Sequence, residues 1–258
     1  MSGCECTKYR IRLAGLSRQV RVAVLADLHG SRGCDLDAIE KYLRFTDPDI
    51  ALMPGDIFER LDGSHSKCNE KAFEFLERVS KICPVYLSAG NHENGGTHSW
   101  NTIKWKVFKP LVRGYDKDEL ERIAKFGVFL DDGYAEFLGI RIGGLSSGLI
   151  NEDGKPSLDW LDDFCKFDGV KILMCHHPEY YEDYLEDREI DLVVSGHAHG
   201  GQCRIFGRGM FAPGQGFLPK YTSGVHHGNL VISRGLKRGC VLPRLFNKPE
   251  VVIVDLDP

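Results

Sequence analysis

Long hydrophobic runs are missing from this sequence. The longest unbroken apolar stretch is five residues, at positions 22–26, whereas a membrane-spanning helix needs about 18 or more. The N-terminal residues contain no apolar segment of the kind that a secretory signal carries. These absences predict a chain without a transmembrane segment and with a cytoplasmic location, and they leave a peripheral location at a membrane open.

A regular cysteine framework and an excess of positive charge are also lacking. The nine cysteines follow no regular spacing, which in a chain of 258 residues favours reduced thiols over structural disulfides. The 33 lysine and arginine residues are outnumbered by 37 aspartate and glutamate residues, for a net charge of −4. This balance argues against a broad surface for nucleic acids.

Short apolar segments alternate with helical patterns along the chain, which is typical of an α/β fold. Because no repeat or low-complexity linker divides the sequence, we expect a single domain over residues 1–258. Residues 207–224 are rich in Gly and Pro and are predicted to form a long loop that borders a substrate cleft. Residues 128–143 are predicted to form a meander of three short strands. The other predicted strands are 9–14, 20–26, 50–53, 85–89, 170–175, 192–195, 202–206, 230–233 and 251–256, and the predicted helices are 35–46, 68–82, 101–111, 116–126, 157–167 and 179–187.

Five of the predicted strands are followed directly by residues that can bind metals. In each case an apolar run ends, and Asp, Asn or His side chains come within the next few residues. The five segments are Asp27-Leu-His29, Gly55-Asp56, Gly90-Asn91-His92-Glu93, His176-His177-Pro178 and Gly196-His197-Ala198-His199.

These segments are expected to meet in one crevice, because the strands of an α/β sheet share one carboxyl edge. Alternation along an extended chain would point Asp27 and His29 to one side, and likewise His197 and His199. The same alternation places His176 and His177 on opposite sides, so we expect only one of them to bind a metal directly.

The donor set predicts the kind of metal site. Seven oxygen and nitrogen donors are too many for one tetrahedral ion, and they suit two ions about 3.5–4 Å apart that share a carboxylate. Imidazole, carboxylate and amide donors without a required thiolate suit Mn, Fe, Zn or Ni rather than Ca.

In their residues and their order over positions 27–199, the five segments resemble the motifs of the calcineurin-like metallophosphoesterase superfamily. The later segments Gly200-Gly201-Gln202, Ser233-Arg234-Gly235-Leu236 and Pro249-Glu250 resemble its branch of small bacterial phosphodiesterase-like proteins, which extends the resemblance over almost the whole chain. The resemblance implies a four-layer fold in which two mixed β-sheets form a sandwich flanked by helices.

The resemblance also implies a role for each candidate ligand. One divalent ion would be bound by Asp27, His29, His199 and the bridging Asp56, and the second by Asp56, Asn91, His176 and His197. His176 is chosen over His177 from the family pattern.

The implied activity is hydrolysis of a phosphoester, with a phosphodiester favoured over a monoester. A hydroxide that bridges the two ions would attack phosphorus, with His92 as general acid and Glu93 as its orienting partner. The implied substrate is a small nucleotide, lipid or sugar phosphodiester. The alternative is a catalytically decayed metal-binding or sensor protein of the same fold. The presence of His92 together with all the ligands argues against this alternative.

Two further histidines are candidate substrate contacts. His177 either reaches the substrate or satisfies a hydrogen bond. His226 either contacts the substrate at the edge of the cleft or belongs to a solvated loop. A local cluster of positive charge lies nearby in the sequence and consists of Arg234, Lys237, Arg238 and Arg244. These residues either steer phosphate or form an ordinary solvated surface.

Overall fold

A computed structural model describes residues 3–31, 33–94, 114–148, 151, 154–239 and 244–258. The predicted helix at 101–111 lies outside the described residues. Within the described part of the chain, no helix has both the length and the apolar character needed to cross a membrane.

The first sheet has six strands in the order β1-β16-β2-β3-β4-β5. Strands β2 to β5 run parallel to one another, whereas β16 is antiparallel to β2 and parallel to β1. The strands are β1 (Glu5–Arg12), β2 (Val20–Val24), β3 (Ile50–Pro54), β4 (Val85–Ser88), β5 (Val128–Leu130) and β16 (Glu250–Asp257).

The second sheet also has six strands, in the order β14-β15-β9-β8-β7-β6. The four central strands are parallel, and the two edge strands are antiparallel to their neighbours. The strands are β6 (Gly133–Phe137), β7 (Ile140–Leu145), β8 (Val170–Cys175), β9 (Leu192–Ser195), β14 (Gly224–His226) and β15 (Leu230–Ile232).

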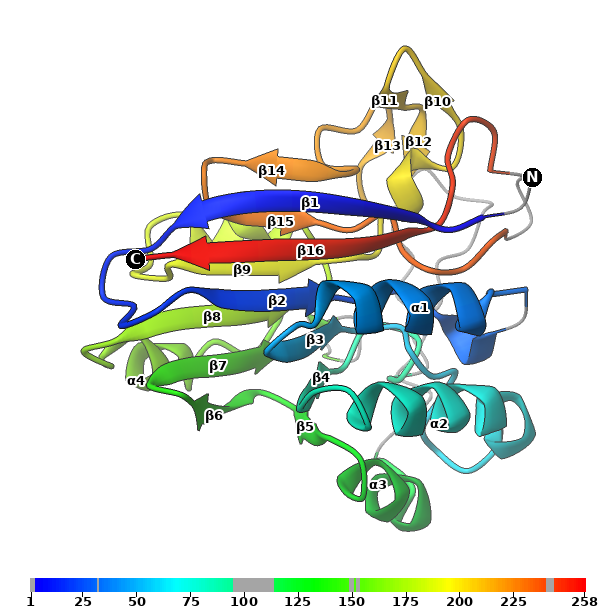
Figure 1. Ribbon diagram of the computed structural model, residues 1–258, viewed down its shortest axis with the longest axis horizontal. Coiled ribbons are helices and arrows are strands. Elements are labelled where there is room, and N and C mark those ends of the chain that lie inside the picture. Colours follow the sequence, from blue (N-terminus) through cyan, green and yellow to red (C-terminus); the bar gives the residue numbers. More distant parts are fainter. Residues whose placement is uncertain (1–2, 32, 95–113, 149–150, 152–153, 240–243) are drawn as a thin grey trace.

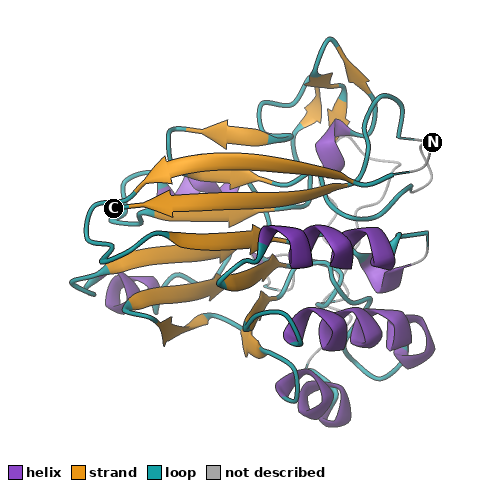
Figure 2. Cartoon of the chain, viewed as in Figure 1, coloured by secondary structure: helices purple, strands orange, loops and turns teal. Residues whose placement is uncertain are grey.

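Helices cover the outer faces of the two sheets, which gives four layers (Figures 1 and 2). The first sheet is covered by α1 (Leu36–Thr46), α2 (Ser66–Ser80) and α3 (Lys117–Ala124), and the second by α4 (Leu161–Cys165) and a π-helical turn, η3 (Tyr181–Leu185). The mixed α/β fold with two sheets and flanking helices is therefore confirmed.

The inner strands are buried on both faces, and alternate side chains of each strand pack into different hydrophobic clusters. In β2, Val22 and Val24 pack in the cluster between the sheets, whereas Ala23 packs in the cluster under the helices. Strands covered on both faces are apolar at almost every position. All of β3 is apolar, and β8 departs from this only at Lys171, whose Nζ donates to the backbone carbonyls of Phe167 and Gly169. Asp35 and Asp116 cap α1 and α3 by accepting backbone N–H bonds from Ala38 and Glu119.

Two sequence predictions about strands are wrong in part. Only β6 and β7 form an antiparallel hairpin, because β5 belongs to the first sheet, where it pairs with β4. The predicted strand at 202–206 is reduced to β10 (Arg204–Ile205), and the predicted loop at 207–224 contains the short strands β11 (Arg208–Gly209), β12 (Phe211–Ala212) and β13 (Gly216–Phe217). These strands form two small antiparallel ladders, β10–β11 and β12–β13.

Candidate metal centre

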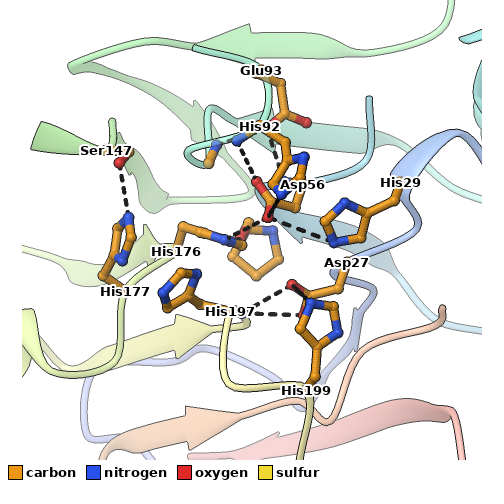
Figure 3. A network of polar contacts seen from close by, with 12 residues as sticks. Asp27, His29, Asp56, His92, Glu93, Ser147, His176, His177, His197 and His199 are labelled. Atoms are coloured by element: carbon orange, nitrogen blue, oxygen red, sulfur yellow. Dashed lines mark hydrogen bonds and ion pairs between the residues drawn. The ribbon is translucent and has the colours of Figure 1, made fainter. Parts of the chain in front are cut away.

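The candidate ligands lie at the carboxyl ends of parallel strands from both sheets. Asp27 and Asp56 follow β2 and β3 of the first sheet, and His176 and His197 follow β8 and β9 of the second. Figure 3 shows their side chains pointing toward one another across the space between these strand ends. The sandwich therefore brings together segments that are 170 positions apart in the chain, as in the bond from the His197 N–H to Asp27 Oδ1.

Asp27, His29 and His199 form the first group. One ligand atom from each lies within 4.8 Å of the other two. The imidazoles of His29 and His199 are stacked, with ring centroids 5.2 Å apart. Asp27 is fixed by the backbone N–H of His197, which donates to Oδ1 and Oδ2 at 3.0 and 3.1 Å.

Asp56, His176 and His197 form the second group, again with one ligand atom from each within 4.8 Å. Oδ2 of Asp56 lies 3.1 Å from His176 Nε2 and 3.6 Å from His29 Nε2 of the first group. Asp56 therefore lies between the two groups, and its carboxylate is the one that faces both.

The backbone at these positions is left-handed rather than extended. The φ angles of Asp27, His29, Asp56, His197 and His199 are 56°, 51°, 55°, 66° and 46°. The expectation that strand alternation turns His197 and His199 to the same side is therefore wrong. His197 belongs to the group of Asp56, whereas His199, which begins the short 3₁₀ turn η4 (His199–Gly201), belongs to the group of Asp27.

Glycines let the strand ends approach one another closely. A Cβ atom built on Gly55 would lie 2.7 Å from both the Cα of Gly90 and Nδ1 of His176. A Cβ atom on Gly90 would lie 2.7 Å from the backbone nitrogen of Asp56. Only glycine fits at these two positions, so the Gly before Asp56 and the Gly before Asn91 hold the two loops in contact.

The electrostatics of the groups fit divalent cations. Burial lowers the pKa of His29 to about 4, and together with the neighbouring His29 it holds the pKa of His199 well below its usual range, so both imidazoles are neutral and carry a lone pair. Burial opposes ionisation of Asp56, but His176 and His92 outweigh it and hold the pKa of that carboxyl well below its usual range.

His176 carries the positive charge that balances this carboxylate in the absence of metal. Burial favours the neutral imidazole, but Asp56 outweighs it and raises the pKa of His176 to about 10. Nε2 of His176 and Nε2 of His29 are buried, and neither completes a hydrogen bond within the described part of the chain. A cation between these nitrogens and Asp56 would replace the proton and satisfy both atoms, so the residues present fit a metal centre.

His92 is held by a residue that the sequence analysis missed. Its Nδ1 lies 2.8 Å from Glu59 Oε2, and its Nε2 faces the cluster, 4.0 Å from Asp56 Oδ2. Burial lowers the pKa of His92, but the negative charges of Asp56 and Glu59 outweigh the effect of burial and raise this pKa to about 9. Glu59 also lies 3.3 Å from Nδ1 of His29. Its position three residues after Asp56 in the same loop is the only sequence signal that pointed to it.

Glu93 occupies a different place from the one expected. Its carboxylate accepts backbone N–H bonds from Asp56, Ile57, Phe58 and Gly90 at 2.7–2.9 Å. The structure thus places Glu59, not Glu93, against the imidazole of His92, and Glu93 joins the loop after β3 to the loop after β4. Asn91 is buried in the loop after β4, and the backbone N–H of the next residue, His92, donates to Asp56 Oδ1 at 2.9 Å.

The two candidate substrate histidines lie in different surroundings. His177 is buried; its Nε2 lies 2.8 Å from Ser147 Oγ, its Nδ1 lies 3.4 Å from Glu179 Oε1, and its ring packs 4.2 Å from that of His197. His226 lies on the edge strand β14, where Nε2 contacts the carbonyl of Ser223. The candidate metal groups found among the described residues do not include His226.

Comparison with known proteins gives a family match that includes every candidate ligand, from Asp27 to His199. The family model described as calcineurin-like phosphoesterase matches residues 20–201. Protein 244L of Invertebrate iridescent virus 6, named as a phosphoesterase, is 40% identical over 217 residues, which cover 80% of this chain and 67% of that protein. A protein of Synechococcus named a probable cyclic nucleotide phosphodiesterase is 27% identical over 231 residues, covering 76% of this chain and 79% of that protein.

In other relatives the region that aligns with this chain is only part of a longer protein. The alignments cover 31% of YpbG of Bacillus subtilis and 63% of the metallophosphoesterase Cj0846 of Campylobacter jejuni, so the chain spans less than two thirds of either protein. Among solved structures, the phosphopantetheinyl hydrolase PptH of Mycobacterium tuberculosis aligns with 12% identity and a TM-score of 0.42, over 84% of this chain and 89% of that one.

Proposed function

Because the chain belongs to the calcineurin-like phosphoesterase family, we propose that it is a single-domain, dinuclear metal-dependent phosphoesterase that hydrolyses phosphodiesters in preference to monoesters. The observation that carries the proposal is the position of Asp56, whose Oδ2 faces both His29 and His176 from between the two groups. A carboxylate in this position can serve two ions at once.

Seven residues would hold the two cations. Asp27, His29 and His199 would bind the first together with Asp56, and Asn91, His176 and His197 would bind the second together with the same Asp56. When bound, such cations supply Lewis-acid activation of a water molecule and neutralise negative charge on the phosphoryl oxygens. Mn, Fe, Zn and Ni all suit this set of imidazole, carboxylate and amide donors.

His92 would supply the proton that the leaving oxygen needs. The raised pKa, about 9, keeps the imidazole protonated near neutral pH. Glu59 holds Nδ1, so Nε2, which faces Asp56 and the cluster, is the nitrogen that can donate to a departing alkoxide. His92 is about one quarter exposed at its side chain, which leaves it accessible from the solvent side of the site.

The preference for diesters rests on the resemblance to the phosphodiesterase-like branch and on the name of the Synechococcus relative. The candidate substrates are small nucleotide, lipid or sugar phosphodiesters. A cytoplasmic location agrees with the eight described cysteines, all of which are free thiols.

The test combines turnover with metal analysis. The chelator-stripped protein is expected to hydrolyse a bis-aryl phosphodiester faster than the matching monoester after Mn²⁺ is added, and not before. His92→Ala should keep its metal and lose roughly 10²- to 10⁴-fold in kcat, most on esters with poor leaving groups. His65→Ala is the matched control, because His65 lies at the start of α2 and outside every candidate metal group of the described residues.

Three outcomes would count against this assignment. Full activity of His92→Ala would remove the role given to that residue. Two ions bound at full occupancy to Asp56→Asn would contradict the shared carboxylate. Tight metal binding by the wild-type chain without turnover of any phosphoester would favour the alternative, a metal-binding or sensor protein.

A further inference from the structure

Three bulky apolar side chains protrude into solvent from a turn and two bends beside the candidate metal centre. Phe206, Leu218 and Phe246 are 101%, 70% and 89% exposed, and each has a positive φ, 51°, 54° and 54°. Phe206 occupies the first position of the two-residue turn between β10 and β11, where Asn, Asp or Gly is favoured. Neither packing nor turn geometry accounts for an apolar residue at these positions, which we call the tip residues.

Each tip residue is followed two positions later by an exposed cation. The three pairs are Phe206 and Arg208, Leu218 and Lys220, and Phe246 and Lys248. Arg208 has no acidic partner among the described residues, whereas Lys220 and Lys248 make ion pairs with Glu182 and Glu5 on the surface. Exposed ion pairs of this kind are weak, so both ammonium groups stay available to an outside anion.

The segment that carries the tips differs in charge from the rest of the chain. Residues 192–249 contain eight Lys and Arg and no Asp or Glu, whereas the remaining residues contain 25 Lys and Arg against 37 Asp and Glu. The negative net charge of the whole protein therefore conceals a strongly basic region.

The tips belong to one substructure. The backbone N–H of Arg204 donates to the carbonyl of Leu245 at 2.9 Å, which joins the β10 turn to the segment with Phe246, and the N–H of Leu218 donates to the carbonyl of Met210 at 3.0 Å. In Figure 1, β10 to β13 project as a group beyond β1 and β14, which are edge strands of the two large sheets.

The same substructure adjoins the metal centre. Nδ2 of Asn247, next to Phe246, donates to the carbonyl of the candidate ligand His199 at 2.7 Å. The N–H of Met210 donates to the carbonyl of Gly201, at the end of η4, at 3.1 Å.

We propose that the tip residues and their cations form a docking surface for a lipid bilayer with anionic headgroups. Isolated apolar side chains at turn tips can enter the boundary between headgroups and acyl chains, while cations just behind them meet the headgroup phosphates and carboxylates. Single-stranded nucleic acid is bound by aromatic faces that line a basic groove, whereas here the apolar groups protrude on separate turns and one of them is aliphatic. None of the tip residues or their cations belongs to a candidate metal group of the described residues, so vesicle binding is expected with or without metal.

The experiment uses the full chain and sedimentation with vesicles of phosphatidylcholine, with and without about one third phosphatidylserine. We expect binding to the anionic vesicles and little to the neutral ones. The variant with Phe206→Ser, Leu218→Ser and Phe246→Ser is expected to bind on the order of 100-fold more weakly. The control variant carries Phe45→Ser, Val128→Ser and Leu138→Ser, which change exposed apolar residues outside the β10–β13 substructure, and it should bind like the wild type.

A second pair of variants tests the cations. Arg208→Gln, Lys220→Gln and Lys248→Gln together should weaken binding and flatten its dependence on salt. The same number of charges removed from α1 and α2, by Lys41→Gln, Lys67→Gln and Lys71→Gln, should change neither. Circular dichroism and turnover of a soluble phosphodiester confirm that the variants fold, and a wild-type chain that binds vesicles without turnover would contradict the proposed activity but not the docking surface.

Three results would overturn the docking surface. One is a wild-type protein that does not sediment with anionic vesicles. Another is equal loss of binding in the tip variant and in its control. The third is tip-dependent binding of a single-stranded oligonucleotide in place of vesicles.

Discussion

Glu59 is the residue whose side chain contacts Nδ1 of His92. Its carboxylate lies 2.8 Å from Nδ1 of His92 and helps to raise the pKa of that imidazole to about 9. Burial opposes ionisation of Glu59, but its hydrogen bonds to His29 and His92 outweigh it and lower its pKa well below the usual range. Glu59 is thus an anion throughout the neutral range. It holds Nδ1 of His92 and, together with Asp56, keeps that imidazole protonated.

Replacing this carboxylate by an amide gives a prediction with a definite sign. A general acid acts only while protonated, so the rate is expected to fall as pH rises through the pKa of His92. Glu59→Gln removes a charge that raises this pKa, so the fall should move to lower pH, and kcat should drop by about tenfold or more. The pH profile of kcat measures the shift.

Glu77→Gln is a suitable comparison, because Glu77 is a half-exposed residue of α2 whose side chain pairs only with Lys81 among its described contacts. An unchanged alkaline limb in Glu59→Gln would mean that Glu59 does not control the proton on His92.

For single residues, the sequence could predict which side chains meet at the site but not which of them contact one another. Strand-end positions selected the residues from Asp27 to His199 that the structure brings together. They could not distinguish Glu59 from Glu93, because that difference depends on the course of two loops. Glu93 is adjacent to His92 in sequence, yet it turns its carboxylate to four backbone N–H groups instead.

Among the elements, the close approach of the loops after β3 and β4 determines the shape of the site. Gly90 has an ordinary φ, so only space forbids a side chain there. A Cβ atom would meet the backbone nitrogen of Asp56 at 2.7 Å and would also press on its carboxylate. The two loops must therefore separate if any larger residue is introduced.

Gly90→Ala should consequently damage both stability and metal binding. We expect the free energy of unfolding to fall by about 1–3 kcal/mol, as for other overpacked sites, and the metal content to fall with it because Asp56 is displaced. Urea denaturation and elemental analysis measure the two effects. Gly114→Ala is the control, since a Cβ atom there would meet nothing within 4 Å, and its effect should stay within about 0.5 kcal/mol. Equal effects of the two substitutions would contradict the role of the close approach.

The elements themselves were predictable where periodicity is long and strong. The predicted helices at 35–46 and 68–82 correspond to α1 and α2, and the apolar runs at 50–53 and 170–175 correspond to β3 and β8. Short segments were not predictable, because pairing rather than local sequence decides their structure. The segment 128–130 joins the first sheet through β4, and the two-residue strands after residue 203 exist only as ladders with one another.

At the scale of the whole molecule, the candidate metal centre connects the two sheets. Asp27 and Asp56 belong to loops of the first sheet, and His176, His197 and His199 to loops of the second. The unfolded chain cannot hold these side chains together, so a metal that binds here binds the folded protein alone.

Metal should therefore raise the melting temperature, by an amount that grows with the logarithm of the ratio of free metal to Kd. At a free concentration about 100-fold above Kd, one site stabilises the fold by about 2.7 kcal/mol. Differential scanning calorimetry of chelator-stripped protein, with and without Mn²⁺, measures the change, and Asp56→Asn should abolish most of it. A melting temperature that stays constant while elemental analysis reports bound ions would place those ions outside the cluster.

The overall architecture followed from the family resemblance, but the strand order did not follow from the sequence pattern. Nothing in the apolar run at 251–256 indicates that it lies between β1 and β2. That position depends on pairing with residues more than 200 positions away, for example Val254 with Tyr9 on one side and with Val22 on the other.

The place of β16 has a consequence for how the protein is made. During translation β1 and β2 leave the ribosome early, but the strand that lies between them, β16, begins only at residue 250. Until β16 emerges, the facing edges of β1 and β2 have unpaired backbone N–H and C=O groups, which can pair with a strand of another chain. A nascent chain that stalls before residue 250 would therefore lack the strand between β1 and β2 in its first sheet. We expect such a chain to depend on a chaperone until synthesis resumes.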